Sequence, residues 1–210
     1  AQARVDTIVL EEGGHHQGHE FNQREEDMYP MLYRAGGQQL TEDGLLSVMQ
    51  GSVRGGGTVI NTADCTKIEP EVLAHWRRSH GLTQLTEAAF EPSYRALWQE
   101  LNIHRLEDGI INKNNGLLLE TANRLGYRAG VFESNRRNCV GSSYCLIGCS
   151  YNAKQGAHIT FVPQAEEAGA RICTDVRADR IERKDGGGYL VHASVVERGP
   201  RTPRLAMTID

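Results

Sequence analysis

The chain has 210 residues, of which 39% are hydrophobic and 24% are charged, and its formal net charge is −4. This length allows one large domain or two small ones, and the composition is that of a globular protein. No apolar run approaches the roughly 18 residues that span a bilayer. The acidic balance, without a block of basic residues, argues against a nucleic-acid-binding surface. The 23 glycines are clustered, which is typical of backbone that turns sharply or lies close to a ligand.

The two ends of the sequence suggest a fragment of a longer protein. The chain starts at Ala1 without a methionine, and it ends in an expected strand, RLAMTID, without a closing element. We therefore expect the true N-terminus to be absent, so that the lack of a signal peptide says nothing about localisation. Cytoplasmic, periplasmic and membrane-associated locations all stay open.

The first elements are expected in the following order. A β-branched apolar run at residues 4–10 predicts a short buried strand that leads into a loop at residues 11–19. Residues 70–79 predict a helix, because a proline stands near its start and Gly81 shortly after its end. A second helix is expected over residues 86–101, whose apolar side chains share one face, with Pro92 delaying the start of its regular part.

Two more helices and a group of strands follow. Residues 115–125 predict a helix that follows an asparagine cap and stops at Gly126, and residues 160–168 predict another with a proline in its first turn. The hydrophobic period then changes from 3.6 to 2, which predicts an antiparallel meander. The turn DGGG at residues 185–188 predicts a hairpin. The expected strands are ARICTDV, RADRIERK, GYLVHASVVE and RLAMTID.

The first candidate site is TIVLEEGG at residues 7–14. A strand that ends in an acidic residue can present its carboxylate to an adenosine ribose, so Glu11 is a candidate for the ribose hydroxyls. The alternative is an ordinary solvated glutamate. The companion motif GxGxxG should stand about 20 residues earlier, and this chain has no room for it.

The second candidate site is GSVRGGGTVIN at residues 51–61. Consecutive glycines before Thr58 and Asn61 favour neither a strand nor a helix. They suit a loop whose amides face a phosphate or a planar ring, because no side chain blocks the approach. The alternative is a flexible surface loop, although the apolar residues that follow indicate burial.

The third candidate site contains Cys139, Cys145 and Cys149, spaced C-x5-C-x3-C. A disulfide framework is disfavoured by the odd total of five cysteines and by the size of the chain. Structural zinc usually shows closer cysteine pairs and needs a fourth ligand. Three thiolates suffice for an iron–sulfur cluster that lacks one iron, and scattered reduced thiols are the other alternative.

Taken together, these motifs resemble those of the glucose–methanol–choline (GMC) family of flavin oxidoreductases. They follow one another in the same order as in that family, and the resemblance covers nearly the whole chain. IVLEEGG resembles its second flavin-domain strand, and GSVRGGGTVIN resembles its first signature. GCSYNAKQGAHITFVPQAEEAGARICTDVRADRI resembles the return to the flavin domain. Bacterial long-chain-alcohol and choline-dehydrogenase-like members resemble it most.

The resemblance implies an α/β fold with FAD as cofactor. We expect an incomplete Rossmann-like FAD-binding domain over residues 1–69 and 136–210, with a helical insertion toward the substrate side at residues 70–135 and the antiparallel β-meander. The residues that would bind FAD are Glu11 at the ribose, Gly55, Gly56, Gly57, Thr58 and Asn61 at the flavin, and Val176 through its backbone at the adenine. Ser52 and Arg54 depart from the family pattern, which favours a basic or amide residue and an aliphatic one.

The implied activity is oxidation of an alcohol, with hydride transfer from the carbinol carbon to the flavin N5. The base in this family is a histidine in a segment that this chain lacks, so no catalytic residue is assigned. His15, His16 and His19 form a loop cluster that either binds a metal or is a solvated polar loop. We expect the 210-residue fragment to be inactive and to retain FAD weakly.

The resemblance also bears on the cysteines. Family members of the glucose and sorbitol dehydrogenase type carry a three-iron (3Fe-4S) cluster on a C-x5-C-x3-C segment at this place, whereas related alcohol oxidases have other spacings and no known cluster. A cluster at Cys139, Cys145 and Cys149 would relay electrons to an acceptor protein or a quinone. The rival hypotheses are a non-catalytic flavin-fold remnant or partner-binding subunit, and a zinc-binding module. The sequence does not identify the alcohol, the acceptor or the oligomeric state.

Overall fold

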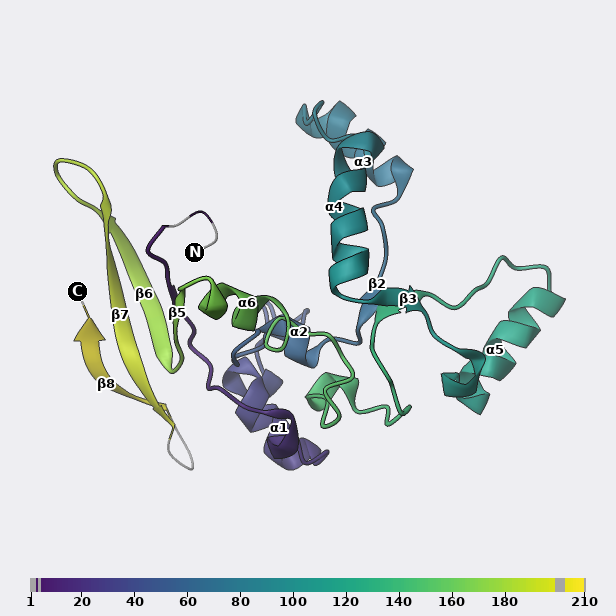
Figure 1. Cartoon of the computed structure of the whole chain (residues 1–210), viewed down its shortest axis with the longest axis horizontal. Helices are drawn as coiled ribbons and strands as arrows, with labels where there is room; N and C mark the ends of the chain where they lie inside the picture. Colours follow the sequence, from purple (N-terminus) through teal and green to yellow (C-terminus); the bar gives the residue numbers. More distant parts are fainter. Residues whose placement is uncertain (1–2, 4, 199–202, 210) are drawn as a thin grey trace. The chain divides into compact units, whose positions relative to one another are not determined.

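The computed structural model describes residue 3, residues 5–198 and residues 203–209 of the chain, shown in Figure 1. The chain divides into two compact units. Unit 1 contains residues 1–61, 144–152 and 156–210, and unit 2 contains residues 62–143 and 153–155. The division expected at residues 69/70 and 135/136 concerns domains of the whole protein and stays a prediction.

Unit 1 contains a short parallel pair of strands. β1 (Ile8–Leu10) pairs with β5 (Arg171–Cys173), with Val9 opposite Ile172. The prediction that ARICTDV belongs to the antiparallel meander is therefore wrong. β5 directly follows the helix α6 (Phe161–Glu167), and its connection to β1 is long and contains helices. Parallel strands need such a long connection, whereas antiparallel neighbours can be joined by a tight turn.

The prediction that the first strand is buried is also wrong in the described structure. The expected run at residues 4–10 forms a strand only over β1, and residue 4 lies outside the described residues. Ile8 is 51% exposed and Val9 is 42% exposed. Among the described strands β1 pairs with β5 alone, so the two side chains have little sheet beside them. Parallel sheets are normally covered on both faces.

The predicted meander forms three antiparallel strands in the order β6-β7-β8, drawn side by side in Figure 1. They are β6 (Val176–Arg183), β7 (Tyr189–Arg198) and β8 (Pro203–Ile209). The predicted hairpin is confirmed, since Lys184 donates its amide to the Gly188 carbonyl at 3.1 Å. Glycines 186–188 all have positive φ, a conformation that residues with a Cβ rarely adopt.

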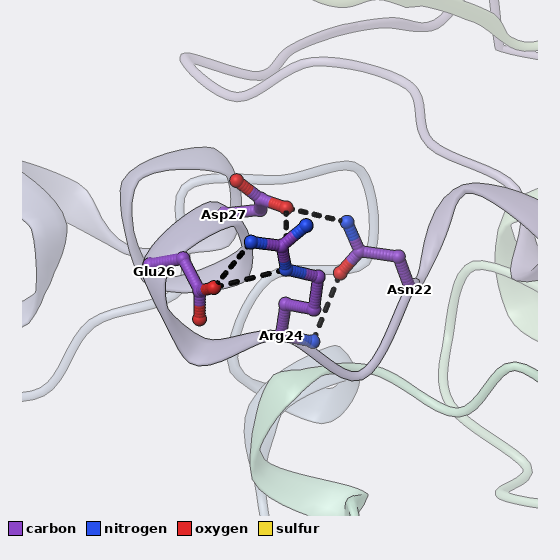
Figure 2. A network of polar contacts seen from close by, with 4 residues as sticks. All are labelled: Asn22, Arg24, Glu26 and Asp27. Atoms are coloured by element: carbon purple, nitrogen blue, oxygen red, sulfur yellow. Dashed lines mark hydrogen bonds and ion pairs between the residues drawn. The ribbon is translucent and has the colours of Figure 1, made fainter.

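The core of unit 1 is built around α1 (Glu25–Leu32), which buries Met28 and Leu32 completely. A network of exposed polar side chains, shown in Figure 2, surrounds the start of α1, and in it the Arg24 guanidinium donates to Glu26 at 2.6 Å. The backbone amide of Arg24 donates to the Asn22 side chain at 2.9 Å. The buried cluster consists of Phe21, Met28, Leu32, Tyr33, Val53, Val59, Ile60 and Ile147. It joins α1 to the short helix α2 (Gly57–Ile60) and to the 3-10 turn η4 (Cys145–Ile147).

Short 3-10 helices connect the larger elements. In unit 1, η1 (Gly18–Glu20) precedes α1 and η2 (Arg34–Gly37) follows it. In unit 2, η3 (Asp108–Ile110) precedes the last helix of that unit. Such turns are common at helix ends and in connections.

Unit 2 contains a small sheet and three helices. The sheet order is β2-β4-β3, formed by β2 (Asp64–Cys65), β4 (Glu133–Asn135) and β3 (Ile103–Arg105), all antiparallel. The helices are α3 (Pro70–His80), α4 (Glu87–Glu100) and α5 (Lys113–Arg124). The indole nitrogen of Trp98 on α4 donates to Glu133 of β4 at 3.0 Å, which joins a helix to the sheet.

The predicted helix ends are mostly correct. α3 ends at Gly81, which adopts the left-handed conformation with φ 65°. Pro92 does not delay α4, which begins at Glu87 because the Thr86 side chain accepts the amide of Ala89 at 3.2 Å. Pro92 removes one interior hydrogen bond without ending the helix. α5 starts earlier than expected, after Asn112.

The described architecture is that of an α/β fold with parallel and antiparallel sheets, as predicted. No helix among the described residues has the length and apolar character needed to cross a membrane.

Candidate functional site

The predicted adenosine-binding residues Glu11 and Val176 lie side by side in unit 1. The amide of Val176 donates to the Glu11 carbonyl at 2.9 Å, and the amide of Glu11 donates to the Cys173 carbonyl at 2.9 Å. These bonds continue the parallel pairing of β1 and β5. The acidic strand end and the start of β6 are therefore held at one point by backbone bonds.

The turn after Glu11 is held by that same residue. One carboxylate oxygen of Glu11 accepts the amide of Gly13 at 2.6 Å. The Gly13 carbonyl accepts the amide of Asp175 at 3.0 Å, and Asp175 has the left-handed φ of 58°. A carboxylate has further lone pairs for ribose hydroxyls, so this bond is compatible with the predicted role of Glu11.

Gly13 brings the first two sequence motifs into direct contact. A Cβ on Gly13 would lie 1.9 Å from the Val53 nitrogen and 2.0 Å from the Ser52 carbonyl carbon, so only glycine fits. The amide of Arg54 donates to the Gly14 carbonyl at 2.8 Å. The segments EEGG and GSVR thus run backbone against backbone.

The glycine turn that follows combines one crowded glycine with two that have open space beside them. Gly55 has φ 99°, and a Cβ there would lie 2.8 Å from the His158 Cβ. By contrast, a Cβ on Gly56 or Gly57 would have no protein atom within 4 Å. The amides of Gly57 and Thr58 belong to the first turn of α2, where backbone donors have no intrahelical acceptor. The turn therefore combines open space with backbone donors, which fits a planar, polar-edged ring.

The Thr58 hydroxyl has a role within the protein. It donates to the Gly55 carbonyl at 2.6 Å and accepts the amide of Ala157 at 2.9 Å. The hydroxyl thus ties the glycine turn to the segment that precedes α6. Asn61 is exposed at the end of α2. Contacts of Thr58 and Asn61 with FAD stay predictions.

The two residues that depart from the family pattern are both shielded. Ser52 is 7% exposed, and its amide donates to the Leu32 carbonyl at 2.8 Å. The guanidinium of Arg54 pairs with Glu166 of α6 at 2.5 Å, with the Arg54 side chain only 11% exposed. Sequence reasoning missed this ion pair because its partners are far apart in the chain. The sequence offered one indication, a charged residue at a position that is aliphatic in the family pattern.

The histidine loop next to Glu11 is organised by one ion pair. Nδ1 of His16 lies 3.1 Å from Glu20. Glu20 also accepts the amide of Gln17 at 2.7 Å, and this bond, followed by the one from His16, lowers the pKa of Glu20. His158, by contrast, is buried and packs edge-on against Phe21, with ring centroids 6.4 Å apart.

The three cysteines of the C-x5-C-x3-C segment are divided between the two units. Cys139 belongs to unit 2, and Cys145 and Cys149 belong to unit 1. All three are free thiols. Nowhere in the described part of the chain are three His, Cys, Asp or Glu side chains grouped so that they could hold a metal ion. The cluster at Cys139, Cys145 and Cys149 stays a prediction from their spacing.

Comparisons with known proteins agree with the family resemblance. The family model described as GMC oxidoreductase matches residues 29–204. A protein of Mycobacterium tuberculosis (strain H37Rv) named as an uncharacterized GMC-type oxidoreductase is 35% identical over 195 residues, which cover 92% of this chain and 31% of that protein. Long-chain-alcohol oxidase FAO4B of Arabidopsis thaliana is 28% identical over 186 residues, which cover 86% of this chain and 24% of that protein.

The match covers most of this chain but about a third or less of the length of these curated relatives. The family model alone spans well over half of the chain. The chain belongs to the GMC oxidoreductase family, whose N-terminal domain binds FAD.

Proposed function

We propose that the chain is part of an FAD-dependent oxidoreductase that oxidises the CH–OH group of an alcohol. The observation that carries this proposal is the glycine turn at Gly55–Gly57, which leaves open space over Gly56 and Gly57. Close packing of Gly13 against Ser52 and Val53 holds this turn beside the strand end at Glu11. An alcohol is the proposed substrate because relatives are named as long-chain-alcohol oxidases.

The residues of this chain would bind and orient the cofactor. Glu11 would accept hydrogen bonds from the ribose hydroxyls, and the Val176 backbone would contact the adenine. Gly55, Gly56, Gly57, Thr58 and Asn61 would contact the flavin. Bound FAD would supply the hydride acceptor. We assign no catalytic acid or base to any residue of this chain.

The experiment that tests this proposal compares two glycine variants in the full-length protein that contains this chain. Gly57→Ala meets no protein atom within 4 Å, so we expect the free energy of unfolding of the apoprotein to change by less than about 0.5 kcal/mol. The new methyl group would occupy flavin space, so FAD affinity should fall at least roughly tenfold. Flavin fluorescence titration measures the affinity, and long-chain primary alcohols serve as trial substrates.

A matched variant separates a ligand effect from a general effect of adding a methyl group. Gly116 lies within α5 of unit 2, and a Cβ there also meets nothing within 4 Å. Gly116→Ala should leave FAD affinity unchanged. A native full-length protein that binds no FAD, or equal affinity in Gly57→Ala and the native protein, would contradict the proposed site.

The second candidate is a dehydrogenase that passes electrons through a 3Fe-4S cluster to an acceptor protein or a quinone. The observation in its favour is the spacing of Cys139, Cys145 and Cys149. Iron and acid-labile sulfide analysis of the full-length protein, purified without oxygen, tests it. About three irons per flavin, lost in Cys145→Ser, would support the cluster. Flavin without iron would leave an oxidase or a simple dehydrogenase, and zinc without sulfide would favour a zinc site.

A further inference from the structure

Arg54 occupies an unusual position beside the proposed flavin site. It directly precedes Gly55, and its own amide donates to the Gly14 carbonyl at 2.8 Å. Its backbone is therefore fixed to the loop that follows Glu11. A cationic side chain at this point introduces a charge within one side-chain length of the open turn.

The Arg54 side chain is shielded and held from two sides. Its terminal nitrogens reach Glu166 at 2.5 Å and the His15 ring at 3.4 Å. Only 11% of the Arg54 side chain is exposed, against 39% of the Glu166 side chain. Solvent therefore screens the guanidinium less than it screens the Glu166 carboxylate.

One donor of Arg54 has no acceptor among the described residues. Its Nε is buried and lacks a hydrogen-bond partner there. A guanidinium offers five donors in a fixed plane, and a buried donor without an acceptor is unfavourable. A negatively charged or carbonyl-bearing group bound at the adjacent turn would offset that cost.

We propose that Arg54 is a positioning residue for FAD, whose guanidinium, fixed by Glu166, stabilises the bound flavin and favours its reduced form. This inference rests on the proposed function. Reduction increases the negative charge of the flavin, and a nearby positive charge stabilises the more negative state. Charges near the ring are among the means by which a protein tunes flavin chemistry.

The test uses variants of the two partners in the full-length protein, with the reduction potential of bound FAD and its dissociation constant as readouts. Arg54→Leu, which restores the aliphatic residue of the family pattern, removes the positive charge. We expect the ratio of reduced to oxidised bound FAD, measured at a fixed applied potential, to fall roughly tenfold. This is the size of effect that one partly shielded charge produces. Glu166→Gln removes the opposing negative charge, so the ratio should rise.

The opposite signs distinguish this inference from a purely structural ion pair. A structural pair would weaken FAD binding in both variants and leave the potential unchanged or shifted in the same direction, and either result would overturn the inference. Arg54→Lys keeps the positive charge and is the alternative variant if Arg54→Leu fails to fold. Its bound FAD should have a reduction potential close to that of the native protein. Arg24→Leu breaks the exposed pair with Glu26, whose side chains are 64% and 63% exposed, and should change neither readout.

The same measurements distinguish failure of the proposed function from failure of the inference about Arg54. If the native full-length protein binds no FAD, the proposed function fails and this inference fails with it. If FAD binds and the potential is the same in Arg54→Leu as in the native protein, the inference alone is wrong.

Discussion

The amide of Val176 donates to the carbonyl of Glu11 at 2.9 Å, so two residues that are far apart in the sequence share one backbone bond. This bond extends the pairing of β1 with β5, and Val176 also begins the meander strand β6. The proposed adenosine site is therefore held by backbone hydrogen bonds, and the Glu11 carboxylate adds one more by accepting the Gly13 amide at 2.6 Å.

The first prediction concerns Gly13, which joins this strand end to the glycine turn. In Gly13→Ala the Cβ would lie 1.9 Å from the Val53 nitrogen. The nearest atoms, from Val53 and Ser52, belong to the backbone. The clash can therefore be relieved only if the loop that contains Gly13 moves away from the segment that contains Ser52 and Val53. We expect the free energy of unfolding to fall by about 3 kcal/mol or more, measured by chemical denaturation of the full-length protein.

Gly116→Ala is the matched control for that substitution. Gly116 is a helical residue with open space at its Cβ position, so alanine should stabilise α5 by about 0.5–1 kcal/mol. Equal stability of Gly13→Ala and the native protein would show that the two segments are not in close contact.

The second prediction concerns Tyr33 in the core of unit 1. Its hydroxyl donates to the Leu146 carbonyl at 2.6 Å, and burial raises its pKa from 10.0 to about 12. The folded state thus keeps the phenol proton at pH values where the unfolded state loses it. Stability from this group is present below pH 10.0 and declines as the pH rises toward about 12.

The phenolate absorbance difference between the native protein and Tyr33→Phe measures this titration directly. We expect a midpoint near 12 and a shallower alkaline loss of stability in the variant. Tyr33→Phe should also cost about 1 kcal/mol at neutral pH, because the Leu146 carbonyl loses its donor. A midpoint close to 10.0 would mean that the hydroxyl is accessible to water.

The local features of this fold were predictable from sequence, and the reasons are physical. Gly81 ends α3 because a left-handed residue is needed there, and the glycines at residues 186–188 make a hairpin turn that few other residues tolerate. Both depend on conformations of single residues. The turn at Gly55 and Gly56 likewise depends on positive φ at single residues, whereas the expectation of no helix in this segment is wrong, because α2 begins at Gly57.

The non-local features were not predictable in this way. The pairing of β5 with β1 depends on segments far apart in the chain, and short apolar runs do not indicate their partners. The ion pair of Arg54 with Glu166 has the same character. For the cysteines, the spacing predicts a joint site, and whether the three thiols converge in space is a non-local property that spacing alone does not determine.

The third prediction concerns the loss of stability at acid pH. The Gln17 amide and then His16 lower the pKa of Glu20 below its ordinary value of 4.5. The folded state therefore favours the ionised carboxylate, so its contribution is complete above pH 4.5 and is lost as the pH falls through the lowered pKa. Glu20→Gln should reduce the slope of unfolding free energy against pH in the acid range.

His16→Asn provides the internal comparison for that prediction. The larger cause of the lowered pKa is the bond from the Gln17 amide, which this variant retains. We expect it to keep most of the acid dependence that Glu20→Gln removes. If His16→Asn reduced the slope of unfolding free energy against pH as much as Glu20→Gln does, the ion pair with His16, and not the backbone bond from Gln17, would be the main cause of the lowered pKa.

The fourth prediction compares the capped helices of unit 2. The Thr86 side chain accepts the amide of Ala89 at 3.2 Å, and the Asn112 side chain accepts the amide of Asn115 at 2.9 Å. Thr86→Ala and Asn112→Ala should each destabilise their own helix by about 1 kcal/mol. Faster amide hydrogen exchange in the first turn of each helix measures this loss.

The control variant is Glu69→Ala, because Glu69 precedes α3 without a side-chain cap bond. The free energy of opening of α3, measured by hydrogen exchange, should stay within about 0.5 kcal/mol of the native value. Equal acceleration in all three variants would show that the exchange reports opening of the whole unit rather than loss of a cap.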